Sequence, residues 1–164
     1  MSKSAEISHL EQLIDEWQDR LYSLAFFRLG DEGAAQDVVQ KAFIRYHRER
    51  QRKVIANEKA WLYRTTLNLA IDHLRHRPPI RAVPLSAALD QMAEEQLALH
   101  EEYRRLEDLL APLPDDQASV IRLHFTDDLS FSEIADILNI SRDTVKSRYR
   151  YAMQKLRRIF NKRE

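Results

Sequence analysis

The sequence contains no cysteine among its 164 residues. Disulfide bonds, thiolate metal ligands and cysteine nucleophiles are therefore excluded, and the composition fits a reducing compartment. Glycine is almost as scarce, with two residues in the whole chain. Because Walker loops and dinucleotide-binding loops need several glycines to bring backbone close to phosphate, the sequence does not indicate a nucleotide-dependent enzyme.

Long apolar runs are also missing. The densest apolar stretch, residues 21–27, is far too short to cross a bilayer, and acidic residues near the start precede any apolar region of the kind found in signal peptides. We therefore expect a cytoplasmic protein with no membrane insertion. Hydrophobic residues nevertheless make up 44% of the chain, which is enough for a buried core.

Apolar residues recur at helical spacing, and no stretch alternates convincingly between apolar and polar residues as a half-buried strand would. The first apolar stripe runs from Leu10 to Ala25 and stops before Gly30, a residue type that commonly ends helices. Further stripes predict helices over about 34–50 and from about residue 58 to residue 75. The predicted fold class is all-α.

Two adjacent prolines divide the chain. Pro78 and Pro79 must end the third helix, because proline lacks the amide and disfavours helical geometry in the preceding residue. We predict two small helical domains, over 1–77 and 100–164, joined by a linker over 78–99 that has some helical potential.

The net charge of zero hides an uneven distribution along the chain. Residues 78–111 carry a net charge of −4 and residues 112–140 a net charge of −5, whereas residues 141–164 carry +7, from nine Lys or Arg against two Asp or Glu. A basic end segment after acidic ones is typical of a nucleic-acid-binding surface. Charge alone leaves open that this segment is only a solvated basic helix.

The last third of the chain carries the pattern of a helix-turn-helix. Ser130 and Glu133 have the spacing of a capping box, which marks the start of a helix. Asn139 stands where the turn needs a left-handed residue, and Ser141 can cap the helix that follows. The pattern predicts DNA binding, with a purely structural helical hairpin as the alternative.

The polar side of the last helix is the predicted reading surface. Val145, Ala152 and Leu156 repeat at helical spacing and define the opposite, buried side. Long side-chain donors reach guanine edges in the major groove, short hydroxyls suit close approach, and flanking arginines bind phosphates. The candidate DNA-binding residues here are Arg142, Thr144, Lys146, Ser147, Arg148, Arg150 and Tyr151.

These motifs resemble a known family. Leu-Ser-Phe-Ser-Glu-Ile-Ala at 129–135 and Thr-Val-Lys-Ser-Arg at 144–148 are similar to region 4 of bacterial sigma factors, although response-regulator output domains share part of this pattern. Asp-Val-Val-Gln-Lys-Ala-Phe at 37–43 resembles sigma region 2.2, and residues 60–75 resemble regions 2.3 and 2.4. Both matches, without large insertions, indicate the compact extracytoplasmic-function (ECF) type of the sigma-70 family.

The resemblance implies partners and residue roles. Region 2.2 of such factors docks on the β′ clamp helices of core RNA polymerase, region 4 touches the β flap and reads the -35 promoter element, and an anti-sigma factor commonly inhibits them. Polymerase-binding candidates are Asp37, Val38, Gln40 and Phe43. No cofactor and no catalytic residue is expected.

A stripe in the third predicted helix is the candidate for the -10 element, which regions 2.3 and 2.4 melt and read. Aromatic and guanidinium groups stack on unpaired bases, and an amide can read a base edge. The stripe consists of Trp61, Arg64, Asn68, Asp72 and Arg75, at spacings of three or four. Residue patterns alone leave open that Trp61 is core, and that Asp37 and Gln40 are merely solvated.

Two other classes of function remain as alternatives. A helix-turn-helix regulator would act on duplex DNA without polymerase, and a nucleic-acid enzyme would need a metal or nucleophile constellation that the sequence does not contain. His73 and His76 have ligand spacing but no evident third ligand, so no metal site is predicted. Acidic pairs such as Asp127 and Asp128 are interpreted as helix caps and solvated turns.

Overall fold

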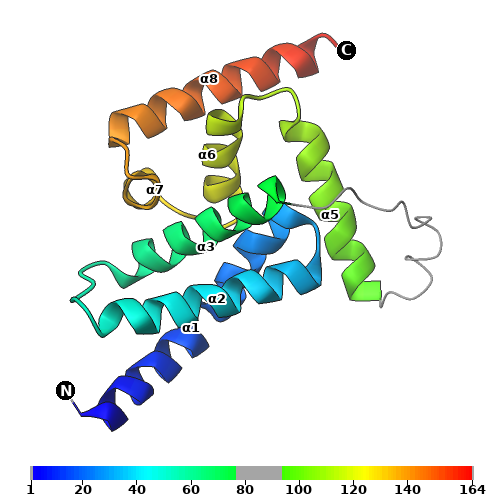
Figure 1. Cartoon of the computed structure of the whole chain (residues 1–164). Coiled ribbons are helices and arrows are strands. Elements are labelled where there is room, and N and C mark those ends of the chain that lie inside the picture. Colours follow the sequence, from blue (N-terminus) through cyan, green and yellow to red (C-terminus); the bar gives the residue numbers. More distant parts are fainter. Residues whose placement is uncertain (1, 77–93, 164) are drawn as a thin grey trace.

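The structure is a computed structural model that describes residues 2–76 and 94–163. Over these two ranges the chain forms seven α-helices and no strand, so the predicted all-α class is confirmed (Figure 1). The helices are α1 (Lys3–Leu29), α2 (Glu32–Arg50), α3 (Glu58–Arg75), α5 (Glu94–Leu110), α6 (Asp115–Phe125), α7 (Phe131–Leu138) and α8 (Arg142–Asn161).

Side-chain caps start the first three helices. The Ser2 hydroxyl, the Asp31 carboxylate and the Asn57 amide oxygen each accept a hydrogen bond from the backbone N–H three residues later. Such caps satisfy backbone donors that have no partner within the helix. The Asp31 cap explains why α2 begins at Glu32, two residues before the start that the apolar stripe indicates.

Helices α1, α2 and α3 pack against one another as a three-helix bundle. Each helix contributes a fully buried side, and the largest buried side chains include Phe26 from α1, Tyr46 from α2 and Tyr63 from α3. Trp17 adds an edge-to-face ring contact with Tyr63, with 6.2 Å between centroids. Aromatic side chains bury large areas, so these residues contribute to the apolar packing that holds α3.

Helices α7 and α8 form the predicted helix-turn-helix, and α6 packs against both. The Glu133 backbone donates to the Ser130 hydroxyl at 3.1 Å, and the Ser130 backbone donates to the Glu133 carboxylate at 3.2 Å, so the capping box is confirmed. Asn139 is left-handed with φ 55°, and Ser141 caps α8, both as predicted. Local sequence signals therefore determine the turn.

Helix α5 connects the two halves. It begins at Glu94, so the last part of the predicted linker is helical, and the remainder of that linker lies outside the described residues. Tyr103, near the middle of α5, packs on Phe26 of α1, and the Gln96 amide in its first turn donates to the Glu32 carboxylate of α2 at 3.1 Å. Its last residue, Leu110, is buried with α6 and α8.

The apolar core continues from the bundle into the helix-turn-helix. Buried residues of α1 to α3 form one cluster with Val120, Leu123 and Ile134 of the second half. Helices α3 and α7 lie in direct contact although about 70 residues separate them along the chain (Figure 1). The two halves therefore pack on one another within the described residues.

The two glycines offer a matched test of this packing. Gly30 ends α1 with φ +67°, and a Cβ added there would meet the Tyr103 ring at 2.6 Å, whereas a Cβ at Gly33 would meet its nearest atom at 3.4 Å. We expect Gly30→Ala to lower the free energy of unfolding by about 1–3 kcal/mol, because it combines left-handed strain with a clash. Urea denaturation measures it.

Gly33→Ala is the control for that substitution. This residue lies in the first turn of α2 with ordinary backbone geometry, so alanine should leave the stability unchanged or raise it by up to about 1 kcal/mol. Equal effects of the two substitutions would contradict the role assigned to Gly30.

Candidate nucleic-acid interface

Helix α8 has the two sides that its sequence predicts. Val145, Ala152 and Leu156 are buried against α6 and α7, which confirms the predicted buried side. Lys146 and Arg150 are exposed on the other side. The cap at Ser141 and the left-handed residue before it orient this helix, so the exposed basic side is presented by a rigid element.

The candidate residues of α8 differ in solvent exposure and in their side-chain partners. Arg142, Lys146, Arg150 and Tyr151 are exposed, whereas Thr144, Ser147 and Arg148 are half-buried. The Arg148 guanidinium lies 3.6 Å from the Asp116 carboxylate of α6, and the Arg150 guanidinium lies over the Tyr151 ring, 5.3 Å from its centroid. Lys146 and Arg150 are therefore better placed than Arg148 to reach DNA.

The candidate stripe on α3 is split by its surroundings. Asn68, Asp72 and Arg75 are exposed towards the carboxyl end of the helix, with Asp72 and Arg75 4.0 Å apart. Trp61 and Arg64, nearer the amino end, are half-buried. The stripe predicted as one surface is thus open along one half and partly covered along the other.

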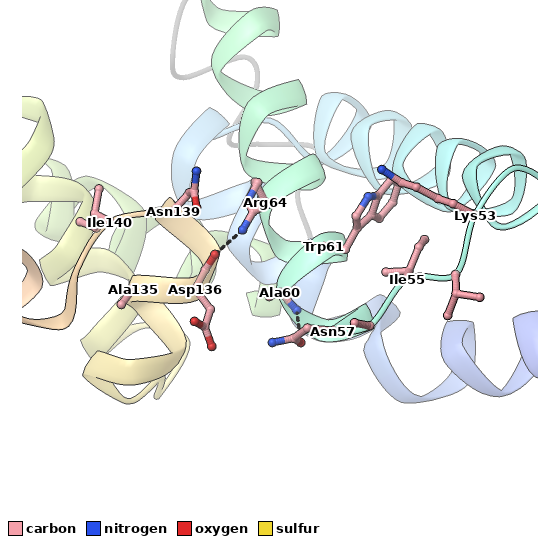
Figure 2. A pocket seen from close by; sticks show the side chains of 12 residues that line it. Lys53, Ile55, Asn57, Ala60, Trp61, Arg64, Ala135, Asp136, Asn139 and Ile140 are labelled. Atoms are coloured by element: carbon pink, nitrogen blue, oxygen red, sulfur yellow. Dashed lines mark hydrogen bonds between the residues drawn. The ribbon is translucent and has the colours of Figure 1, made fainter.

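Trp61 is half-buried: part of its ring packs in the bundle, and part of it borders a cleft. One side of its ring packs edge-on against Tyr46, with 5.7 Å between centroids, and it borders a cleft between α7 and the loop that precedes α3 (Figure 2). The cleft has a volume of about 460 Å³, and Lys53, Arg64 and Asn139 contribute polar groups to it. An unstacked base is flat and could lie on such a surface.

Arg64 reaches across the cleft to the end of α7. Its Nη2 donates to the Asp136 carbonyl, which is the dashed line from Arg64 in Figure 2. Its Nε donates to the Ile137 carbonyl at 2.9 Å. Carbonyls in the last turn of a helix have no partner within the helix and carry partial negative charge, so a guanidinium stabilises them. This candidate DNA-binding residue is therefore bound to the helix-turn-helix.

An ion pair joins the same two helices nearer the amino end of α3. The Lys59 ammonium contacts the Glu133 carboxylate, and Lys59 also lies 5.3 Å from the centroid of the Trp17 ring. The hydrogen bond from Lys59 lowers the pKa of the Glu133 carboxyl below its usual value, with the Ser130 backbone adding to the effect. Sequence reasoning missed this pair because no local signal relates residues 74 positions apart.

The loop between α6 and α7 brings a carboxyl group into the contact between the halves. Asp127 borders a small cleft with Leu24 and Arg28 of α1 and Leu67 of α3. Burial raises its pKa from 3.8 to about 7. Asp127, interpreted from the sequence as part of a solvated turn, is instead half-buried, because the second half packs this loop against the bundle.

Nearby polar groups are also shielded from water. Burial, with Asp127 as the next cause, raises the pKa of the Tyr63 hydroxyl to about 12. Arg28 and Arg122 line the same small cleft as Asp127. The Arg122 guanidinium of α6 donates to the Glu107 carboxylate at 2.6 Å. Burial lowers the pKa of the Arg28 guanidinium. The contact between the halves thus encloses several ionisable groups.

The polymerase-binding candidates on α2 fall into two groups. Asp37 and Gln40 are exposed, and Asp37 pairs with Lys41 at 2.9 Å. Val38 is 3% exposed and Phe43 is 7% exposed. Val38 therefore supports the helix from inside, and its side chain does not face a partner.

A groove between α1 and α2 lies beside these residues. Leu10 and Ile14 of α1 and Phe43 and Ile44 of α2 line it, with Gln40 at its edge. Ile44 is 51% exposed, so the groove presents apolar surface to solvent. Sequence reasoning missed Ile44, whose exposure depends on how α1 crosses α2.

A metal-ligand cluster and a membrane-spanning helix are both absent from residues 2–76 and 94–163. These ranges contain no cluster of three or more potential metal ligands among their His, Asp and Glu side chains. Their helices also include none that is long and apolar enough to cross a membrane.

Comparison with known proteins gives the family. Residues 13–78 match Sigma-70 region 2, and residues 109–158 match Sigma-70, region 4. The ECF RNA polymerase sigma factor SigL of Mycobacterium tuberculosis is 30% identical over 159 residues, which cover 94% of this chain and 90% of SigL. This chain is an ECF sigma factor. The alternative of a regulator unrelated to polymerase is not favoured.

A second relative and a solved structure with a similar fold are also found. The ECF RNA polymerase sigma factor SigW of Bacillus subtilis is 29% identical over 170 residues, covering 95% of this chain and 91% of SigW. The fold is similar to that of the sigma factor RpoE from Bartonella quintana, solved in complex with the anti-sigma factor NepR. That comparison has a TM-score of 0.63 at 21% identity and covers 92% of this chain and 96% of RpoE.

The raised pKa of Asp127 predicts a pH-dependent stability. The unfolded carboxyl loses its proton near pH 3.8 and the folded one near pH 7, so the folded state binds more protons between these values. The contribution of Asp127 to stability is therefore present at low pH and falls as the pH rises from about 4 to about 7. Urea denaturation at several pH values measures this slope.

The amide of Asn at this position mimics the protonated carboxyl. Asp127→Asn should match the unchanged protein near pH 4 and be more stable than it at pH 8. A stability difference that does not change with pH would show that Asp127 is not buried in its neutral form.

Proposed function

We propose that this ECF sigma factor directs promoter-specific initiation by bacterial RNA polymerase, with residues 1–77 binding core enzyme and the -10 element and residues 100–164 reading the -35 element. The observation that carries the proposal is that both sigma regions lie on one chain and each presents an exposed polar helix face. The protein acts in the cytoplasm, where polymerase is found, and has no catalytic chemistry of its own.

Helix α8 supplies the -35 contacts in this proposal. Its segment carries a net charge of +7, and phosphate contacts of this kind dominate affinity for DNA. Lys146 and Arg150 read base edges because they are exposed on the side away from α6. Arg142 and Arg148, at the start of the helix and on its flank, hold phosphates and fix the register.

Helix α3 captures the opened -10 strand. Unstacking a base costs a few kcal/mol, and contacts to the flipped base offset that cost. Asn68 is exposed and can read the edge of such a base, while Trp61 offers an aromatic face beside the cleft. Arg75 lies beside Asp72 on the exposed part of the helix, where it can contact the backbone of the strand.

Protein partners bind the other side of the bundle. The exposed Asp37 and Gln40 and the apolar groove beside Phe43 and Ile44 offer polar and apolar contacts for the β′ clamp helices. An anti-sigma factor is the expected inhibitor, since the similar sigma factor RpoE was solved with one.

Run-off transcription with purified core polymerase over a promoter library tests the proposal. Transcripts should start at defined promoters only when both core and this protein are present. Specific binding to duplex DNA without any core-dependent transcript would instead indicate an independent regulator.

Arg150→Ala tests base reading by α8. Loss of one base contact should cost about 1–3 kcal/mol at a single -35 position and relax the preference there, because other positions keep their contacts. Holoenzyme binding to promoters with single -35 substitutions measures this. Arg142→Ala, at a predicted phosphate contact, is the comparison, and a uniform loss for Arg150→Ala across all sequences would assign that residue to phosphate as well.

Asn68→Ala tests strand capture by α3. We expect core binding to remain and promoter opening to be lost, because the exposed amide would no longer hold a flipped base. Permanganate reactivity of -10 thymines reports the opening, and co-purification with core reports binding. Reactivity equal to that of the unchanged protein would remove Asn68 from this role.

A further inference from the structure

Three side chains, one from each helix of the bundle, meet at a single carboxylate oxygen. The Tyr46 hydroxyl of α2 donates to Oε2 of Glu58 in α3, and Nε2 of His9 in α1 lies 2.9 Å from the same oxygen. Tyr46 is 2% exposed, whereas the side chains of His9 and Glu58 are 35% and 27% exposed. We call these three residues the Glu58 network. None of them belongs to the α3 stripe or to the polymerase-binding candidates.

The Glu58 network reaches Trp61 by two routes. The Tyr46 ring packs edge-on against the Trp61 ring, with 5.7 Å between centroids, so a bond that fixes the Tyr46 hydroxyl also fixes the ring on which Trp61 rests. Glu58 is the first residue of α3 and lies one helical turn before Trp61. Contacts to Glu58 therefore hold both the neighbour of the indole and the start of the helix that carries it.

The network also closes the base of the loop between α2 and α3. Tyr46 lies in the last turns of α2, which ends at Arg50, and Glu58 begins α3, so their hydrogen bond joins the two ends of residues 51–57. Lys53 and Ile55 of this loop line the cleft beside Trp61 (Figure 2). The loop and the indole are thus tied to the same carboxylate.

We propose that the Glu58 network positions Trp61: it holds the indole ring at the border of the cleft in the orientation that stacks on a base of the opened -10 strand. The inference rests on the proposed function, which gives capture of that strand to α3. His9, Tyr46 and Glu58 are positioning residues, because they act through the Trp61 ring and the start of α3 and do not contact DNA themselves.

Hydrogen bonds add a constraint that ring packing lacks. Aromatic contacts tolerate a range of tilts, whereas a hydrogen bond to a carboxylate is directional and stronger than one between neutral groups. Glu58 receives such contacts from two other helices, so the Tyr46 ring cannot turn away from Trp61 without breaking its bond. A binding surface held by its supporting residues captures a ligand better than one that must be ordered on binding.

Tyr46→Phe is the main test, because it removes the hydroxyl and keeps the ring that packs on Trp61. We expect holoenzyme with this variant to open promoters about three- to tenfold less well, since part of the stacking on the captured base is lost. Permanganate reactivity of -10 thymines measures the opening. Co-purification with core should be unchanged, because the exposed Asp37 and Gln40 are not altered.

Tyr63→Phe is the matched control. It removes a hydroxyl from a side chain of α3 that is 1% exposed and whose ring packs on Trp17 rather than on Trp61. Promoter opening should stay at the level of the unchanged protein. Equal losses of opening in Tyr46→Phe and Tyr63→Phe would overturn the proposal, since they would reflect a general weakening of the bundle.

His9 permits a rescue at a partly exposed position, where substitution should not prevent folding. His9→Ala removes one partner of Glu58, and His9→Gln supplies an amide donor of similar reach. We expect opening to fall about two- to fivefold in His9→Ala, as loss of one hydrogen bond predicts, and to be restored in His9→Gln. Opening that is equally poor in both variants, or reduced in neither, would contradict the role of His9.

The fluorescence of Trp61 reports its positioning directly. The chain has two tryptophans, so Trp17→Phe leaves Trp61 as the only one. In this background we expect Tyr46→Phe to increase the quenching of Trp61 by acrylamide, because a ring that is no longer held is reached by the quencher more often. Unchanged quenching would show that the network does not act on Trp61, and would overturn the proposal even if opening were reduced.

The two proposals fail in different ways. If the protein does not direct initiation, the unchanged chain will give no core-dependent transcript, while Trp61 quenching still responds to Tyr46→Phe. If the Glu58 network does not position Trp61, quenching will not respond to Tyr46→Phe, while core-dependent transcription by the unchanged protein remains.

Discussion

The contacts at the end of α7 are the constraint on which the arrangement of the whole chain depends. At eight residues α7 is too short to be stable alone, and its start is satisfied locally by the capping box. At its end, backbone N–H groups of the turn satisfy the Ala135 carbonyl, and Arg64 satisfies those of Asp136 and Ile137. Because Arg64 of α3 binds the last carbonyls of α7, this contact connects the second half of the protein to the first.

This dependence explains why a candidate DNA-binding residue has a structural role as well. Arg64 belongs to the α3 stripe, whose other side is buried in the bundle by Leu62, Tyr63 and Leu67. A rigid helix is needed to hold an opened strand in place, and the bundle supplies that rigidity. The same rigidity makes α3 a firm surface for α7, which Arg64 contacts at its carboxyl end.

The exposed face of α8 and the contact between the two halves differ in charge and in burial. The α8 face is basic and exposed, as binding to phosphate requires, whereas the contact between the halves encloses Asp127, Arg28 and Arg122. Buried ionisable groups make an interface sensitive to its surroundings, because each charge must be paired or neutralised. The contact is thus less purely apolar than the bundle core.

The sequence by itself determined the elements whose signals are local. The capping box at Ser130 and Glu133, the left-handed Asn139 and the buried side of α8 all depend on residues within one or two helical turns, and all agree with the structure. The roles assigned to individual residues such as Asn68 and Arg150 also came from the sequence and remain predictions.

Only the tertiary structure decided which surfaces are covered. Arg64 and Ile137 are 73 residues apart and Lys59 and Glu133 are 74 apart, and helical periodicity carries no information about such pairs. The burial of Asp127 likewise depends on how one half packs on the other. Hydrogen bonds between distant segments, and the burial that results where these segments meet, depend on packing. Helix caps and apolar stripes depend only on residues that are close together in the sequence.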